Sequence, residues 1–121
     1  MALLTNRDKE ERPWGSFERF TKGEPATIKL VRIAPGKRFS LQFHNHRSEF
    51  WRIINGDGVV TLDGKQFPAS IGDEFEIPVG MKHRMEAGAE GIHFLEIALG
   101  DFDEGDIVRV EDDFGRAESA T

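Results

Sequence analysis

Three of the four histidines and one glutamate are spaced as metal ligands are in β proteins. His44 and His46 are separated by one residue, Glu49 follows three residues later, and His83 lies well downstream. Alternate residues of a strand point to the same face, so a strand here would project His44 and His46 together. Imidazoles and a carboxylate suit a divalent first-row cation. The set is therefore suited to an ion of zinc, manganese, iron, cobalt or nickel, whereas a histidine pair taken alone also fits a plain polar strand surface.

The chain contains no cysteine, which narrows the chemistry further. Disulfides, thiolate nucleophiles, iron–sulfur clusters and cysteine-ligated zinc are excluded, so histidine and carboxylate side chains must hold any metal. The strand face of the histidines would also carry Ser40 and Gln42, while Phe39, Leu41 and Phe43 would pack on the other face. We therefore expect Gln42 to face the substrate.

Basic residues are concentrated around the histidine pair. The net charge is −6, yet the stretch from Lys29 to Arg52 carries six basic residues against one acid. The overall acidity argues against a nucleic-acid partner, whereas the local excess of positive charge favours a small anion.

The length and composition describe one ordinary soluble domain. The 121 residues are 38% hydrophobic and 31% charged, which predicts a single domain over 1–121 with its core at about 12–116 and frayed ends, above all the tail 116–121. No apolar run approaches the ~20 residues that cross a bilayer, and the first residues do not resemble a signal peptide. We expect a cytoplasmic protein with no membrane partner.

Short apolar runs separated by glycine, proline and aspartate predict an all-β jelly roll. The hairpin signal at Asp63-Gly64 is the strongest of the turns. Residues 105–114 fit either a short helix or an extended edge. Edge strands favour cover by a second copy, so we expect a homodimer in which strand 15–21 supplies that cover. The expected strands are 15–21, 26–33, 39–43, 50–55, 58–62, 65–69, 74–77, 83–86 and 91–98.

Two blocks of the sequence resemble the cupin superfamily. The first contains the histidine pair and its glutamate, followed after six residues by Gly56. The second runs from Gly72 to His83 and fits the pattern GxxxxxPxGxxH without a gap. The resemblance implies a single-domain, all-β, cupin-type jelly-roll β-barrel with one metal inside. Its ligands would be His44, His46, Glu49 and His83.

Longer segments are similar to type II phosphomannose isomerases, which form the C-terminal part of bifunctional mannose-1-phosphate guanylyltransferases. These segments are 12–15, 35–44, 46–51 and 106–116. The chain departs from that family at Phe50, where the family has histidine, and at Phe114, where it has tyrosine. The resemblance implies interconversion of mannose 6-phosphate and fructose 6-phosphate through an enediol. Since no glycine-rich nucleotide-binding segment precedes Arg12, we do not expect GDP-mannose synthesis.

An isomerase of this kind needs a base and a phosphate site. The base moves a proton between C1 and C2, and the resemblance implies Glu96 for this role, ahead of Lys82 and His93. The phosphate requires cations, and we expect Arg116 to be the main one. The full set of cations near the motifs is Lys37, Arg38, Arg47, Arg84 and Arg116.

Two other functions stay open at this stage. A non-catalytic metal- and sugar-binding module would carry the same residues. An iron oxygenase could use the same ligand shell, although the basic residues would then have no obvious purpose.

Overall fold

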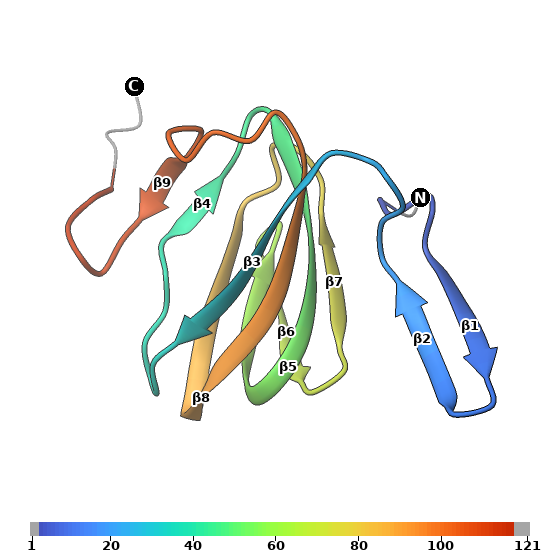
Figure 1. Ribbon diagram of the computed structural model, residues 1–121. Helices are drawn as coiled ribbons and strands as arrows, with labels where there is room; N and C mark the ends of the chain where they lie inside the picture. Colours follow the sequence, from blue (N-terminus) through green and yellow to red (C-terminus); the bar gives the residue numbers. More distant parts are fainter. Residues whose placement is uncertain (1–2, 118–121) are drawn as a thin grey trace.

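A computed structural model describes residues 3–117, which fold into antiparallel strands joined by turns (Figure 1). These residues form no helix, and so none long and apolar enough to cross a membrane. The prediction of an all-β fold is confirmed. The strands are β1 (Asp8–Arg12), β2 (Gly15–Arg19), β3 (Ala26–Ile33), β4 (Leu41–Phe43), β5 (Arg47–Leu62), β6 (Lys65–Ser70), β7 (Glu74–Ile77), β8 (His83–Gly100) and β9 (Val108–Glu111).

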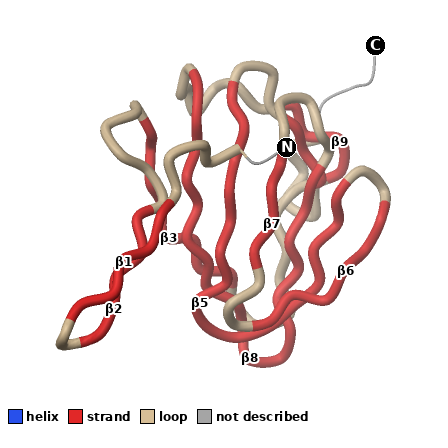
Figure 2. Tube along the Cα trace, turned by 90° about the vertical axis from the view of Figure 1, so that its right-hand side faces the viewer, coloured by secondary structure: helices blue, strands red, loops and turns tan. Residues whose placement is uncertain are grey.

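Two long strands, β5 and β8, shape the barrel. They pair with each other along most of their length and curve around one end of the molecule (Figures 1 and 2). On one side of the bend, β3 joins β8 and β7 joins β5. On the other side, β4 joins β8, β9 joins β4, and β6 joins β5. The bend thus turns one continuous sheet into two halves with an interior between them.

Glycine makes this bend possible. The ladder between β5 and β8 shifts register between Ile53 and Asn55 and again between Gly56 and Gly58. Gly56 has a φ of 77°, and a Cβ there would lie 2.1 Å from the carbonyl oxygen of Gly91. No side chain fits in that space, so only glycine allows the strands to approach this closely.

The barrel has an inner core and a smaller apolar cluster on its outer surface. The inner core joins residues from both halves, among them Trp51 and Phe94 from one half and Val60 and Met85 from the other. The outer cluster contains Leu4, Phe50 and Ile97, with Phe20 packed beside them. Packing therefore begins earlier in the chain than the expected residue 12, because Leu4 is buried on the barrel.

Several predicted boundaries change. The strands predicted at 50–55 and 58–62 are one strand, β5, and those at 83–86 and 91–98 are also one, β8. The glycine-rich segments between them bend the backbone without ending it. The strand predicted over 39–43 is limited to Leu41–Phe43, and β1 was not predicted.

Two turn predictions were settled by the structure. Asp63 and Gly64 have φ values of 51° and 79° and connect β5 to β6, which confirms the predicted hairpin. Residues 105–114 contain the extended edge strand β9 and no helix. Most of the tail that we expected to fray, 118–121, lies outside the described residues.

Candidate metal centre

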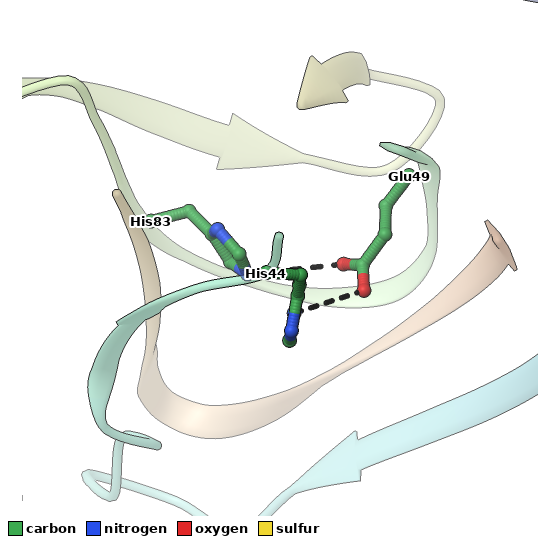
Figure 3. A group of neighbouring side chains, drawn as sticks. All are labelled: His44, Glu49 and His83. Carbon is green, nitrogen blue, oxygen red and sulfur yellow. Dashed lines mark ion pairs between the residues drawn. The ribbon is translucent and has the colours of Figure 1, made fainter. Parts of the chain in front are cut away.

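Three of the four predicted ligands converge inside the barrel (Figure 3). His44 follows β4, Glu49 lies on β5, and His83 begins β8. One possible ligand atom from each lies within 4.8 Å of the others, and all three residues are buried. Nε2 of His44 is 3.2 Å from Oε2 of Glu49, and Nε2 of His83 is 3.8 Å from Oε1 of the same carboxylate.

His46 lies outside this group. The expectation that one strand carries both His44 and His46 was wrong, because β4 ends at Phe43 and β5 begins only at Arg47. The residues between them form a bend, in which the alternation of strand faces does not hold. His44 consequently points into the barrel, while His46 is exposed.

Backbone carbonyl groups orient both buried imidazoles. Nδ1 of His44 is 2.6 Å from the carbonyl oxygen of Asp106, and Nδ1 of His83 is 2.9 Å from that of Met81. A carbonyl oxygen only accepts, so Nδ1 carries the proton in each ring and a neutral ring has its lone pair at Nε2. Both Nε2 atoms face Glu49. Metal-binding histidines are commonly fixed in this way.

The Glu49 carboxylate is held by two donors on its own strand. Nε1 of Trp51 donates to Oε1 over 3.0 Å, and Nε of Arg47 donates to Oε2, also over 3.0 Å. The Arg47 guanidinium also donates to Nε2 of His44 over 3.3 Å. Arg47 thus bridges two of the candidate ligands, and a bound metal would have to replace these contacts.

The ionisation states fit a metal site. Burial alone would raise the pKa of Glu49, but the adjacent His44 ring, the charges around the carboxylate and the Arg47 guanidinium lower that pKa to about 2. Burial lowers the pKa of His83 to about 4. At neutral pH the cluster therefore offers a carboxylate and a neutral imidazole.

One atom of the cluster has no hydrogen-bond partner among residues 3–117. Nε2 of His83 is buried and forms no hydrogen bond. Leaving a buried polar atom unpaired costs about 1–3 kcal/mol, so such atoms in a folded protein call for an explanation. A metal ion between His44, Glu49 and His83 would satisfy this lone pair, and the residues present fit one.

A second carboxyl group lies beside the cluster. Glu96 is buried on the inner face of β8, directly opposite Trp51 on β5 and Lys29 on β3. Burial, followed by the negative charge of Glu49, raises the pKa of Glu96 to about 7. Its Oε2 atom has no hydrogen-bond partner in the described part of the chain. Glu96 is therefore divided between its acid and base forms near neutral pH.

The loop that leads from β8 to β9 lies over one side of the cluster. Lys29 and Arg47 both pack on its Phe102 ring, and their cationic groups lie 4.9 and 4.7 Å from the ring centre. The Asp106 carboxylate accepts hydrogen bonds from the backbone N–H groups of Asn45 and His46. The loop thereby fixes the bend that delivers His44.

Among the other predicted site residues, Gln42 and Arg47 lie at the cluster. Gln42 is opposite His83 in the ladder and accepts a hydrogen bond from Ser40 Oγ over 2.6 Å. Lys82 is exposed in the turn before β8. His93 follows the inward-facing Ile92, so its side chain projects to the outside of the barrel.

Two of the predicted phosphate-binding cations lie away from the cluster. Arg38 pairs with Asp113, and Arg84 donates to the carbonyl oxygens of Phe39 and Glu111. Both arginines line a pocket of about 150 Å³ on the outer face of the barrel. Arg84 lies there because it follows the inward-facing His83 and alternation turns it outward.

Two further predicted cations also form local contacts. Lys37 is exposed in a turn, where its backbone N–H donates to the carbonyl oxygen of Ala34. Arg116 lies beyond β9, where its guanidinium bonds to Asp112. Sequence reasoning missed Lys29, Trp51 and Asp106 as site residues. Of the three, only Trp51 could have been identified from the sequence, because it is two residues from Glu49 and therefore lies on the same face of the strand.

Comparison with known proteins identifies the family of the chain. The family model for the C-terminal domain of mannose-6-phosphate isomerase matches residues 2–112. A mannose-1-phosphate guanylyltransferase of Escherichia coli is 38% identical over 107 residues, which cover 87% of this chain and 23% of that protein. The alginate biosynthesis protein AlgA of Pseudomonas aeruginosa is 36% identical over 107 residues, covering 87% and 22%. The chain thus spans less than a quarter of these relatives.

Solved structures share the fold. A cupin protein from Bacteroides fragilis superimposes with a TM-score of 0.58 at 22% identity, covering 79% of this chain and 72% of that one. A putative sugar phosphate isomerase from Acidithiobacillus ferrooxidans also has a TM-score of 0.58, at 27% identity, covering 64% and 51%. The resemblance drawn from the motifs is confirmed. The chain has the cupin fold and belongs to the family of mannose-6-phosphate isomerase C-terminal domains.

Proposed function

We propose that this chain is a metal-dependent isomerase that interconverts mannose 6-phosphate and fructose 6-phosphate through an enediol. The observation that carries the proposal is the buried group of His44, Glu49 and His83, with Nε2 of His83 unpaired, beside a carboxyl group that titrates near neutrality. Family membership supports the substrate class.

The metal site would activate the sugar. A divalent ion held by His44, Glu49 and His83 would polarise the sugar oxygens and stabilise negative charge on them. Trp51 holds the Glu49 carboxylate by its N–H group, and the carbonyl oxygens of Met81 and Asp106 hold the two imidazoles.

Glu96 would carry the proton. Interconversion removes a proton from one of the two carbons C1 and C2 and returns it to the other, which one carboxyl group can do by acting first as base and then as acid. With a pKa of about 7, Glu96 meets both requirements near neutral pH. Its buried Oε2 atom has no hydrogen-bond partner among the described residues and would exchange the proton with a substrate bound at the cluster.

The phosphate would bind to cations at the loop between β8 and β9. Arg47 and Lys29 both pack on Phe102, and Gln42 lies at the other side of the cluster to bind a sugar hydroxyl. Arg116 remains a proposal from the motif alone, since its guanidinium is bonded to Asp112. Comparing Lys29→Ala with Arg116→Ala decides which cation binds the phosphate.

The test is a coupled isomerase assay after loading with each candidate metal, combined with elemental analysis. We expect turnover of mannose 6-phosphate, with about one metal per chain. Both should be lost in His83→Ala and kept in His46→Ala, which is exposed and serves as the matched control. Glu96→Gln should keep the metal and lose at least a hundredfold in rate. Absence of turnover with every metal would refute the isomerase.

A non-catalytic metal- and sugar-binding module is the second candidate. The observation in its favour is that Arg47 already bridges Glu49 and His44, which gives the cluster internal partners without a reaction. Calorimetric binding of mannose 6-phosphate to the metal-loaded protein, without conversion to fructose 6-phosphate, would identify this function.

A further inference from the structure

Arg109, on β9, is a half-buried cation without a counterion. Eight of the ten arginines pair with a carboxylate of this chain. The other two, Arg32 and Arg109, form no ion pair with the residues that the structure describes. Arg32 is exposed to water, whereas Nε of Arg109 is buried and has no hydrogen-bond partner among those residues. A buried donor without a partner is unfavourable, so this group calls for an explanation.

The unpaired atom of Arg109 faces the same interior as the candidate metal centre. Residues 3–117 contain three buried side-chain polar atoms without a partner, and the other two belong to His83 and Glu96. Gln42 on β4 lies opposite His83 on one side and opposite Arg109 on the other, where β9 lies beside β4 (Figure 1). Residues opposite one another project from the same face of a sheet. His83 points into the barrel, so Gln42 and Arg109 do as well.

A β-bulge directs the nearest acidic residue of β9 away from Arg109. In a regular strand, residues two positions apart share a face, so Glu111 would lie beside Arg109 and neutralise it. The ladder between β4 and β9 instead shifts register: Gln42 is opposite Arg109, but Leu41 is opposite Glu111. Glu111 therefore turns to the outside, where its Oε1 atom lies 3.3 Å from Nη1 of Arg84. Bulges beside binding sites commonly redirect a side chain in this way.

The neighbour of Arg109 on the inner face adds a second hydrogen-bond donor. The side-chain oxygen of Gln42 accepts a hydrogen bond from Ser40 Oγ, which leaves the NH₂ group of the same amide to donate to a ligand. A guanidinium group contains donors only. Two neighbouring side chains that offer donors, one of them positively charged, match an oxyanion.

We propose that Arg109 binds the phosphate group of the sugar phosphate, with the Gln42 amide donating beside it. This inference rests on the proposed function, in which the metal cluster holds C1 and C2 at the other end of the sugar. A phosphate monoester carries about −1.5 to −2 charges near neutral pH and three acceptor oxygens, so several donors bind it at once. Arg109 therefore adds to the cations proposed above.

Arg109 differs from those cations in having no competing carboxylate. Lys29 pairs with Glu104, and Arg47 pairs with Glu49. An anion at either of these cations competes with an acidic side chain of the protein itself. Arg109 has no such competitor in the described part of the chain, and partial burial strengthens its attraction for an anion.

The first experiment measures binding of mannitol 6-phosphate, an alditol that cannot isomerise. Calorimetric titration into the full chain, once with zinc and once with a chelator, gives its dissociation constant without turnover. Arg109→Met should bind it roughly ten- to a hundredfold more weakly than the parent in both conditions, because charge-assisted hydrogen bonds are lost. Mannitol, which lacks the phosphate, should bind no differently to the two proteins.

Arg32→Met is the matched control for this titration. It removes the other arginine without an ion pair, which faces outward between the inward-facing Val31 and Ile33. Its affinity for mannitol 6-phosphate should equal that of the parent. Arg109→Lys keeps the charge but loses the planar pair of donors, so its affinity should lie between those of the parent and Arg109→Met.

The second experiment separates binding from a structural role. Replacing a buried donor that has no partner removes an unfavourable group, so Arg109→Met should melt at or above the temperature of the parent by circular dichroism. Its affinity for zinc should be unchanged, because Arg109 is not one of the candidate ligands.

Each outcome decides the proposal. Equal affinity of the parent for mannitol 6-phosphate and mannitol would overturn it, as would unchanged affinity in Arg109→Met. A melting temperature of Arg109→Met more than about 5 °C below that of the parent would also overturn it, because the arginine would then be structural. A parent that binds mannitol 6-phosphate through Arg109 but does not convert mannose 6-phosphate would refute the isomerase and leave the phosphate site standing.

Discussion

Substituting Glu96 by glutamine should stabilise the metal-free protein at neutral pH. Glu96 is buried opposite Trp51, its Oε2 atom has no hydrogen-bond partner, and the charge of Glu49 is nearby. Ionising a carboxyl group in that position is unfavourable, which is why its pKa lies at about 7 instead of 4.5. Glutamine has nearly the same shape and no charge to develop.

The size of the effect and its pH range follow from this pKa. Between about pH 4.5 and 7 the folded protein binds a proton at Glu96 that the unfolded chain has released, so the free energy of unfolding falls as pH rises. A difference of about 2.5 pH units at about 1.36 kcal/mol per unit gives roughly 3 kcal/mol. Above pH 7 the parent loses this full amount of unfolding free energy. The Glu96→Gln variant should not lose it, because glutamine does not ionise.

His83 produces the opposite slope. Its pKa is lowered from 6.5 to about 4, so the unfolded chain binds the additional proton in that range and stability rises with pH. In the parent these two slopes oppose each other between about pH 4.5 and 6.5. In Glu96→Gln only the rise from His83 remains. The difference between the two proteins therefore isolates Glu96.

Urea unfolding followed by circular dichroism, at half-unit steps from pH 4.5 to 8 with a chelator present, measures this difference. We expect almost none at pH 4.5 and about 3 kcal/mol at pH 7.5. Glu90→Gln, which changes an exposed glutamate on the same strand, should stay within about 0.5 kcal/mol at every pH. A difference that does not vary with pH would refute the reasoning, because it would show that Glu96 does not change its ionisation.

Three further outcomes are expected. Arg47→Met should bind zinc about tenfold more tightly in calorimetric titration, because no guanidinium then competes for Glu49 and His44. The metal-free variant should lose about 3 kcal/mol of unfolding free energy in urea, because Glu49 then has no cation beside it. Weaker zinc binding would contradict this reasoning. Trp51→Phe should weaken zinc binding about tenfold, since Glu49 loses the donor that orients it, and unchanged affinity would count against that role. Gly56→Ala should cost about 2–4 kcal/mol in thermal unfolding because of the contact with the Gly91 carbonyl, whereas Gly64→Ala, which meets no atom within 4 Å, should cost less.

The fold class was readable because its signals are local. Apolar runs, turn residues and the Asp63-Gly64 hairpin depend on neighbours within a few positions, and they located most of the strands. The continuity of β5 and β8 was not readable. Glycine at positions 56 and 91 looks like a strand end in sequence, and only the pairing between distant segments shows that the backbone bends there and continues.

Arg47 lies at the cluster in place of the predicted His46, and the cause is again a contact between residues far apart in the sequence. Alternation would have brought His46 inward if β4 had continued, but Asp106 holds the backbone N–H groups of Asn45 and His46 in a bend. That contact joins residues about sixty positions apart, and no local pattern indicates it. The bend changes which residue faces the barrel, and Arg47 becomes the buried neighbour of Glu49.

This geometry places a cation beside the Glu49 carboxylate within the same strand. A buried Glu49 carboxylate without a cation would cost several kcal/mol, and the Arg47 guanidinium supplies that cation from the same strand. Arg47 is itself held by the carbonyl oxygen of Asp103 and by the Phe102 ring, both in the loop between β8 and β9. A metal held by His44, Glu49 and His83 would take the place of the guanidinium at Glu49, and Arg47 would then remain beside that loop. Under the proposed function, it would there bind an anion such as the phosphate of a sugar.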